Sequence, residues 1–598
     1  MRLVPWVLCL FVACGESDAA GPVDVSSDVD TAPSGVDTSE DGDPSDASSD
    51  TTGPDTSVEA RACPGGTLFE RPFVTSVEPA RPGSLAADFD IETLTGRYAL
   101  ASRWTGCESH IVFVHFPGIT DSLWRSESTV LFSEGPANAQ YIFVSDSADA
   151  EARIDDLVRV ERSIEAGLLV AVRDDAARQA WRDRIHYATG RARELDGGIG
   201  DYVRSELAFG LTPESIVDLG DRGTVGLPAP VVFGITPDQR FDPGDNLSPS
   251  VGQSETLGMA AFLGHFYNWR VALEHELARA SGHVVSIIDE RTTRRIIDST
   301  SSLPDNLMVE HLDSRGNVVA PSVKANRATL EVAIDCEARN PFACSEWDRI
   351  ANISVCTDAT CAARSELVRW ITPYWRRGLQ RYRLDFSHLI GLLNGGETTF
   401  RVELGPDWER PTEWRLEVDL RLEHVDPNPG VPPNAPPPAT TPAGAWPAFA
   451  SQGFGADYGG EGMMFTVPAE ATRVELAVLV SGHGQTAGDN CAEWCDHRHV
   501  FAVDGVEIPP ILHQGAAIGE PRGCANLSKQ GVISGQWGNW AQQRAFWCPG
   551  LEVSWQRRDL TALVTPGDEH ILTLEGFLGA DGAPAGGDIA LTTYLIWY

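Results

Sequence analysis

Positive charge is scarce in this sequence. Its 598 residues include 46 Lys and Arg against 85 Asp and Glu, which gives a formal net charge of −39. Residues 16–60 contain 13 acidic residues and no Lys or Arg, and the remainder of the chain still carries −26. Because binding to a phosphate backbone requires a basic face, this composition argues against nucleic acid as a partner. It argues equally against an anionic membrane surface.

The apolar run at the N-terminus is too short to span a membrane. Residues 3–13 follow Arg2 and are typical of a signal peptide, which we place at 1–14. Phe11–Cys14 resembles a bacterial lipobox, so we expect bacterial export and a lipid anchor at Cys14 on the cell envelope. The alternative is ordinary cleavage that removes Cys14 and gives a secreted protein. Residues 15–60, mostly Asp, Ser, Thr, Gly, Pro and Ala, are expected to form a disordered acidic linker.

The paired C-x2-C knuckles of structural zinc sites are also missing. Export permits disulfides, and ten cysteines remain once Cys9 and Cys14 are set aside. They fall into local pairs: Cys63 with Cys107, Cys336 with Cys344, Cys356 with Cys361, Cys491 with Cys495, and Cys524 with Cys548. The sequence alone does not fix this connectivity. Disulfides are nevertheless favoured over a zinc site.

Residues 61–280 are predicted to form an α/β domain. Apolar strand candidates lie at 111–116, 141–144 and 231–235, and helical spacing appears at 154–164, 174–188 and 255–280. The opening, from Pro82-Gly83 to Trp104-Thr105-Gly106-Cys107, faintly resembles a thioredoxin-like domain. The redox C-x-x-C motif is absent, so redox chemistry is not implied and Cys107 is expected to be structural.

From about residue 282 the pattern changes to β. In the stretch 414–423, apolar and charged residues alternate with period two, which is typical of a strand with one buried and one solvated face. Residues 425–446 are rich in proline and predict a stiff linker. Short strands broken by Gly and Pro before and after it predict β-sandwiches or jelly rolls at 282–424 and 447–598.

Two short islands carry the functional signal. One is Cys344–Arg349 and the other is Cys491–Cys495. Each places a carboxylate beside a Trp and close to a Cys, and the two lie in similarly built β stretches about 145 residues apart. Such an acid adds little stability to an exported β protein, and it more often binds a sugar or moves a proton. We therefore interpret the islands as two halves of one site.

Motifs in register around these islands resemble the peptide-N-glycosidase F family. The matching segments are Cys344–Asn352, Trp370–Trp375, Ser481-Gly482, Cys491–Cys495, Gly538–Ala541 and Arg544–Gly550. The resemblance covers about 330–550 and does not reach 15–280. It implies two adjacent eight-stranded antiparallel jelly rolls with a site at their interface. It also implies an amidase that cleaves the bond between an Asn side chain and the first N-acetylglucosamine of an N-glycan, giving Asp and a glycosylamine.

The resemblance assigns residues by position. It implies catalytic roles for Asp348, Glu493, Arg349 and Arg544 and substrate-binding roles for Trp347 and Trp547. We add Glu403 as a candidate catalytic residue, and Trp408 and His483 as candidate substrate-binding residues. Asp348 would be the base that activates water, Glu493 would hold the sugar or the water, and the two arginines would keep the acids ionised. Indole faces suit the apolar faces of pyranose rings. No metal or cofactor is implied, the partners would be N-glycosylated proteins or peptides, and we expect a monomer.

The resemblance also implies three disulfides, and it has departures. The implied bridges join Cys336 with Cys344, Cys491 with Cys495 and Cys524 with Cys548, and a Cys356–Cys361 bridge would be additional. The third carboxylate of the family does not align cleanly, and Glu403 or Asp407 could serve. A Trp and a His of the family are replaced here by His483 and Gln485. These departures bear on glycan preference and on full activity.

Two other functional classes remain open from the sequence. One is a glycan-binding surface protein with a decayed active site. The other is a copper monooxygenase, a class that shares the twin jelly-roll architecture. Its signal is His497 and His499, whose i and i+2 spacing on a strand points both rings to one face as a copper site requires. No matching His-His pair occurs in the first β region, which favours strand histidines held by hydrogen bonds.

Overall fold

The computed structural model describes residues 61–598 with internal gaps. The gaps are 119, 209–215, 219–223, 227–230, 245–256, 293–310, 319–324, 337–343, 345–347, 359, 374–375, 394–395, 405–413, 426–441, 485–490, 514–521, 534–539, 580–581 and 585. The predicted signal peptide, the predicted lipid anchor at Cys14 and the predicted acidic linker lie outside the described residues. Residues 62–598 form a single contact unit. Within the described residues, no helix is both long and apolar enough to cross a membrane.

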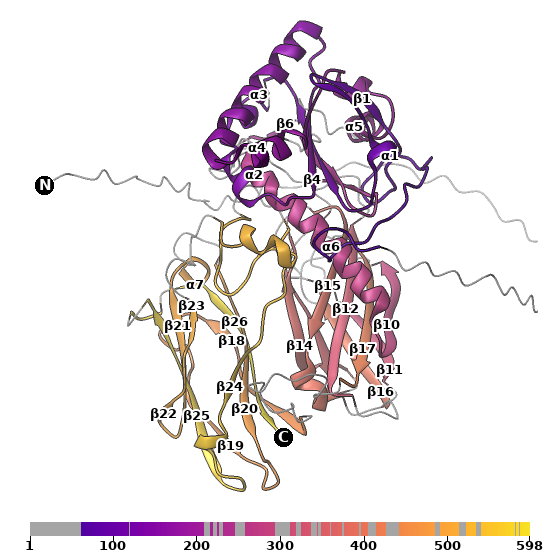
Figure 1. The fold of residues 1–598 in the computed structure, drawn as a ribbon. Coiled ribbons are helices and arrows are strands. Elements are labelled where there is room, and N and C mark those ends of the chain that lie inside the picture. Colours follow the sequence, from indigo (N-terminus) through magenta and orange to yellow (C-terminus); the bar gives the residue numbers. More distant parts are fainter. Residues whose placement is uncertain are drawn as a thin grey trace, which may run out of the picture. The chain divides into compact units, whose positions relative to one another are not determined.

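A mixed sheet organises the N-terminal α/β domain (indigo and purple in Figure 1). Its strand order is β2-β1-β5-β4-β3-β8-β9. The bounds are β1 Asp90–Thr93, β2 Gly96–Ala99, β3 Ser109–His115, β4 Ala139–Ser145, β5 Ile185–Ala188, β8 Val232–Ile235 and β9 Phe241–Asp242, with a separate hairpin of β6 Ile216–Asp218 and β7 Thr224–Gly226. Every residue of β3 and β4 is buried, as expected of strands covered on both faces.

The helices of this domain confirm the helical predictions at 154–164 and 255–280 and correct the one at 174–188. The helical elements are α1 Leu100–Arg103, η1 Leu123–Arg125, α2 Thr129–Glu134, α3 Ala150–Ala171, α4 Asp175–Arg182, η2 Ala192–Glu194, α5 Gly198–Ala208, η4 Leu257–Ala260 and α6 Ala261–Arg279. Asp149 caps α3 and Asp174 caps α4 through their side chains. The helix predicted at 174–188 was too long: it ends at Arg182, and β5 begins three residues later. The residues of β5, Ile185–Ala188, are all buried and pair in parallel with β4, so they belong to the sheet and not to the helix.

The centre of the sheet combines parallel and antiparallel strand pairs. β3 pairs in parallel with β4 and antiparallel with β8, and β8 pairs antiparallel with β9. The resemblance of this domain to a thioredoxin-like domain stays a prediction. Cys63 and Cys107 form a disulfide, in keeping with the structural role expected for Cys107.

Residues 283–423 form the first jelly roll. Its strands are β10 His283–Thr292, β11 His311–Val318, β12 Arg327–Cys336, β13 Ile350–Cys356, β14 Arg364–Ile371, β15 Gly378–Asp385, β16 Gly396–Glu403 and β17 Arg415–Glu423, with the 3-10 turn η6 Ser387–Leu392. They make two four-stranded sheets, β10-β17-β12-β15 and β11-β16-β13-β14. Chain order alternating between two facing sheets in this way defines a jelly roll. The period-two prediction for 414–423 is confirmed, because Leu416, Val418 and Leu420 are fully buried.

Residues 444–598 form the second jelly roll. Its elements are β18 Gly444–Gly453, β19 Met463–Thr466, β20 Val474–His483, α7 Cys491–Trp494, β21 His497–Val503, β22 Val506–Glu507, β23 Ile511–His513, η8 Ala525–Gln530, β24 Gln556–Asp559, η9 Thr561–Leu563, β25 Glu569–Leu578 and β26 Asp588–Trp597. The sheets are β18-β26-β20-β24 and β19-β25-β21-β22. The expected eight strands become nine among the described residues, since β22 and β23 both pair with β21. β18 begins inside the predicted linker.

The two jelly rolls share backbone hydrogen bonds. A segment after the second roll's long loop, 550–553, runs along β14 of the first roll. Gly550 N–H donates to Ile371 O at 2.7 Å, and Val553 N–H donates to Arg369 O at 2.8 Å. One apolar cluster includes residues of both rolls, among them Trp370 and Tyr594. The two rolls are therefore joined by backbone pairing along β14 and by a shared apolar core. These contacts hold the residues at the edge of the interface in place.

The α/β domain contacts both jelly rolls within the same unit. The Arg376 guanidinium Nη2 lies 2.6 Å from both carboxylate oxygens of Asp242, and Arg377 pairs with Glu206. All four side chains are buried. Helix α6 packs against η8 of the second roll. Because burying these charges is costly unless they are paired, the contacts join the domains specifically.

Candidate functional site

A cleft of about 620 Å³ is lined by both jelly rolls. The first roll contributes Asp348, Arg349, Ile350, Asn352 and Glu403, and the second contributes Ser451, Gln452, Gly453, His483, Gly484, Glu493, Trp547, Asp588, Ile589 and Ala590. The cleft thus brings together the carboxylates of the two sequence islands. It contains the three carboxylate residues that were candidates for catalysis: Asp348, Glu493 and Glu403.

Asp348 is held at the cleft by the backbone beside it. It precedes Arg349, whose N–H donates to Thr372 Oγ1 at 2.9 Å and whose carbonyl accepts from Thr372 N–H at 2.9 Å. The Arg349 side chain is 1% exposed, and its guanidinium lies 5.3 Å from the ring centre of Trp414 in the core. Arg349 therefore anchors the segment that presents Asp348. Trp347 lies outside the described residues.

Glu493 sits in the one-turn helix α7, which the Cys491–Cys495 disulfide closes. Its Oε1 accepts from Arg544 Nε at 3.0 Å, and its Oε2 accepts from the Gly484 N–H at 3.2 Å. The carboxyl group is mostly removed from water, and this burial raises its pKa to about 7. Arg544 opposes the rise and the nearby Asp348 adds to it. Both protonation states of Glu493 are therefore populated near neutral pH.

This result corrects one expected role. Arg544 was expected to keep the acid ionised, yet burial outweighs the attraction of its guanidinium. The guanidinium itself is fully buried and lies 4.6 Å from the ring centre of Trp494 and 4.7 Å from that of Trp547. Cation–π contacts with these two indole rings stabilise the buried positive charge in place of water. A carboxyl group with a pKa near the working pH suits proton transfer.

Trp547 forms part of the cleft wall. Its indole N–H donates to the Gly482 carbonyl at 2.8 Å, and its ring packs against Arg544 and stacks on His483 with ring centres 5.3 Å apart. Only 3% of the residue is exposed. These contacts leave little of the ring for a sugar, so we interpret Trp547 as a support for Arg544 and His483. The expected sugar-stacking role stays a prediction.

His483 is a neutral polar group at the cleft. Its Nε2 lies 2.9 Å from Ser481 Oγ. Burial, together with the positive charges of Arg369 and Arg544, lowers the pKa of its imidazole to about 3. A neutral imidazole in this place can exchange hydrogen bonds with a substrate without adding charge.

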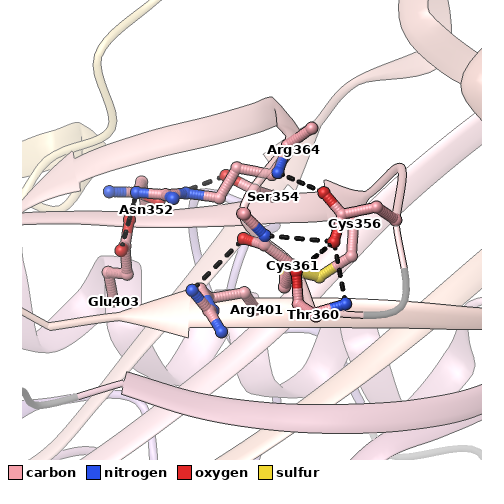
Figure 2. Close-up of a disulfide and its surroundings, with 11 residues drawn as sticks. Asn352, Ser354, Cys356, Thr360, Cys361, Arg364, Arg401 and Glu403 are labelled. Carbon is pink, nitrogen blue, oxygen red and sulfur yellow. Dashed lines mark hydrogen bonds and ion pairs between the residues drawn. A yellow bond between two sulfur atoms is a disulfide. The ribbon is translucent and has the colours of Figure 1, made fainter.

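Glu403, at the end of β16, is the third carboxylate of the cleft. Its register partner on β13 is Asn352. Its Oε1 accepts from Arg364 Nη2 at 2.9 Å, and this contact from β14 reaches across the intervening strand β13 (Figure 2). Glu403 was one of two alternatives. The other, Asp407, lies outside the described residues together with Trp408 and Gln485.

The hairpin that supplies Arg364 carries the additional disulfide, Cys356–Cys361 (Figure 2). The Arg401 Nη1 donates to the Cys361 carbonyl at 3.3 Å, which ties the hairpin to β16. The other expected pairs, Cys336–Cys344 and Cys524–Cys548, are also bonded. Cys524–Cys548 closes the loop that provides Arg544 and Trp547, so it limits the positions available to both.

The two histidines considered as copper ligands are hydrogen-bonded to protein atoms. His497 and His499 are fully buried, and their facing nitrogens, Nδ1 and Nε2, lie 2.9 Å apart in a mutual hydrogen bond. Among the described residues there is no group of three or more His, Cys, Asp or Glu placed to hold a metal. Their shared face was predicted correctly, and their partners are protein atoms.

Several lining residues were missed by the sequence motifs. Asp588 opposes His483 in the β20–β26 register, Gln452 follows on the adjacent strand β18, and Asn352 opposes Glu403. None belongs to a motif beside a Cys or Trp. The only signal that could have found them is strand pairing, which requires knowing the register.

Residues 456–596 match the family model described as peptide-N-glycosidase F, C terminal. The second jelly roll is therefore similar to the C-terminal part of that family. A curated relative, peptide-N(4)-(N-acetyl-beta-D-glucosaminyl)asparagine amidase F of Elizabethkingia miricola, is 28% identical over 256 residues. That match covers 40% of this chain and 65% of the relative, so the chain spans just under two thirds of it.

Two solved structures show the extent of similarity. PNGase F, a glycosylasparaginase from Flavobacterium meningosepticum, is 19% identical with a TM-score of 0.38, over 53% of this chain and 96% of that one. PNGF-II is 12% identical with a TM-score of 0.39, over 54% and 66%. The fold of this chain itself, two adjacent jelly rolls, stands on its own strand order.

Proposed function

We propose that the protein is an amidase that hydrolyses the bond between an Asn side chain and the first N-acetylglucosamine of N-glycoproteins or glycopeptides. The observation that carries the proposal is the shared cleft, which Asp348 of one jelly roll and Glu493 of the other both line. The charge of Asp348 adds to the effect of burial in raising the pKa of Glu493. The similarity of the second roll to the C-terminal part of peptide-N-glycosidase F supports the same reaction class.

The chemistry follows from the two acids. Asp348, as carboxylate, accepts a proton from water while the water oxygen attacks the side-chain amide carbon. Glu493, when protonated, donates to the amide oxygen or nitrogen, and the C–N bond then breaks with a proton delivered to the departing glycosylamine. The products are Asp and the glycosylamine. The N–H of Gly484 and the ring of His483 are further hydrogen-bonding groups at the cleft.

We propose export as the setting of this reaction. All five disulfides lie in the described part of the chain, and such bonds persist in oxidising compartments. N-glycosylated substrates would then be met outside the cell. The anchoring at Cys14 is a separate proposal, tested by labelling cells with a fatty-acid analogue and comparing wild type with Cys14→Ala.

The direct test is to incubate the full chain with an N-glycosylated peptide and weigh the peptide product. An amidase converts Asn to Asp, which adds about one dalton to the sugar-free peptide. A glycosidase would leave Asn carrying one sugar, and a glycan-binding protein would leave the substrate intact. Either of these two products would contradict the proposal.

A further inference from the structure

A row of three buried polar rings lies behind the cleft, in the second jelly roll. His497 and His499 occupy alternate positions of β21, and Tyr458 comes from the segment before β19. Tyr458 Oη lies 2.6 Å from His499 Nδ1, His499 Nε2 lies 2.9 Å from His497 Nδ1, and His497 Nε2 lies 2.9 Å from the Ala492 carbonyl oxygen. The row therefore ends on helix α7, one residue before Glu493.

The row has one consistent direction of hydrogen bonding. The Ala492 carbonyl can only accept, so His497 Nε2 carries a proton and, in a neutral ring, its Nδ1 accepts from His499 Nε2–H. His499 Nδ1 must then accept from the Tyr458 hydroxyl. Burial holds all three rings neutral: it lowers the pKa of His497 to about 4, lowers that of His499 well below its usual value and raises that of Tyr458.

Helix α7 needs such anchors because it is one turn long. A helix of four residues has little hydrogen bonding of its own. Its fixed points are the Cys491–Cys495 bond, the Ala545 N–H that donates to the Glu493 carbonyl at 2.9 Å, and His497. The Ala492 carbonyl also lies so close to Gly482 that any side chain there would collide with it. A small shift of Ala492 would therefore displace Glu493.

The row is enclosed by aromatic rings. Phe454 and Phe546 each pack against both histidines, with ring centres between 5.3 and 6.2 Å apart. Phe546 has a φ of 66°, a conformation that costs a non-glycine residue free energy, and it lies between Ala545 and Trp547. Phe546 therefore links the packing around the two histidines to Ala545, which bonds the Glu493 carbonyl, and to Trp547, which lines the cleft.

We propose that Tyr458, His499 and His497 are positioning residues of the catalytic site, acting through the Ala492 carbonyl to hold the Glu493 carboxyl group in the cleft. None of the three lines the cleft or touches substrate. The inference rests on the proposed function for its effect on turnover. Its structural predictions, which are the direction of the hydrogen bonds in the row and the pKa of Glu493, do not depend on turnover.

Kinetics of full-chain variants test the role. His497→Phe keeps the ring shape and removes the donor, so kcat should fall about 10- to 100-fold with KM changed less than about threefold, as expected when an acid is slightly misplaced. His497→Gln, which retains a donor, should recover part of the loss. The matched control is His570→Gln: His570 is also buried in this roll, bonds Asp504 and Thr565, and does not line the cleft. A loss in His497→Phe no larger than in this control would overturn the role.

Tyr458→Phe covers the case in which His497→Phe does not fold. It removes one hydroxyl from the far end of the row, and kcat should fall about 2- to 10-fold, the worth of one hydrogen bond. Unchanged turnover in a folded Tyr458→Phe protein would contradict the role of the row.

Nuclear magnetic resonance separates this inference from the proposed function. With ¹⁵N-labelled histidine, His497 and His499 should both be neutral Nε2–H tautomers at pH 7. With ¹³C-labelled glutamate, Glu493 should titrate near 7 in wild type and at lower pH in His497→Phe or Tyr458→Phe, because displacement admits water. Nδ1–H or protonated rings, or an unchanged Glu493 titration, would overturn the inference even if the protein cleaves glycopeptides. Failure to cleave with the expected spectra would refute only the proposed function.

Discussion

The two jelly rolls have the same strand order and support their acids in different ways. In the first roll, Asp348 precedes a strand, and backbone bonds between its neighbour Arg349 and Thr372 hold the segment. In the second, Glu493 lies on an isolated turn held by a disulfide, an arginine and a row of buried rings. One fold thus supplies a carboxylate at a strand end and a buried carboxyl group with a raised pKa in a short turn, because the loops differ while the sheets agree.

The largest expected effect comes from removing the first roll's acid. Asp348→Asn keeps the shape of the side chain and removes the base, so kcat should fall about 10³-fold or more, within the range of a lost general base. Steady-state release of glycan from a labelled glycopeptide measures it. Asp358→Asn is the control, since Asp358 caps the β13–β14 turn of the same roll and does not line the cleft. Comparable loss in both variants would refute a chemical role for Asp348.

The second prediction breaks the link between the rolls. Arg369 on β14 donates to the Ala590 carbonyl at 2.6 Å and to Ser481 Oγ at 3.2 Å in the second roll, and pairs with Glu366. Because Arg369 is buried, Arg369→Met should lower the free energy of unfolding by about 3–5 kcal/mol, measured by urea denaturation.

A more exposed arginine on the same strand provides the comparison for this loss of stability. Arg364→Met breaks the more exposed bond to Glu403, and should cost at most about 1 kcal/mol. If both variants lost the same stability, the rolls would not be held together through Arg369.

The third prediction concerns the arginine of the second roll. Arg544 lowers the pKa of Glu493, so Arg544→Gln should raise that pKa further and move the matching limb of the pH–rate profile to higher pH. Losing one preorganised charge should also reduce kcat/KM about 10²-fold. A profile that stays in place, or moves to lower pH, would show that Arg544 does not act on Glu493.

The fourth prediction is a pH effect on stability. The pKa of Glu493 rises from 4.5 to about 7 on folding, so the folded protein binds this proton more tightly than the unfolded chain does. Its contribution to stability is therefore most favourable below pH 4.5 and declines as the pH rises through 7. The stability of wild type relative to Glu493→Gln should fall by about 2–3 kcal/mol between pH 4 and 8. A flat difference, measured by denaturation at several pH values, would contradict the raised pKa.

Motifs were enough to predict the acids, and geometry was needed for their surroundings. Asp348 and Glu493 were found because each sits beside Cys and Trp in a recognisable order. The choice of Glu403 depends on the β16–β13 register, which short motifs do not encode. The shared face of His497 and His499 followed from strand periodicity, yet a copper site and a hydrogen-bonded row look alike until Tyr458 and Ala492 are placed.

The secondary structure was likewise predicted in part by the sequence pattern. Alternation predicted β17 because one face is buried along its length. The stretch 174–188 was predicted as one helix, because apolar spacing does not separate a short helix from a buried strand that follows it. Likewise, the pKa of Glu493 depends on burial by residues distant in sequence, so residue types alone suggested an ionised acid.

The most direct measurement of the central claim is the fate of water oxygen. Wild type acting on a glycopeptide in H₂¹⁸O should release a peptide about three daltons heavier than its Asn form, with the label in the new Asp side chain, against about one dalton in ordinary water. Asp348→Asn should bind the same glycopeptide and return it unlabelled. A sugar-free peptide recovered as Asn, or labelled Asp formed by Asp348→Asn at the wild-type rate, would contradict hydrolysis of the side-chain amide in the cleft between the jelly rolls.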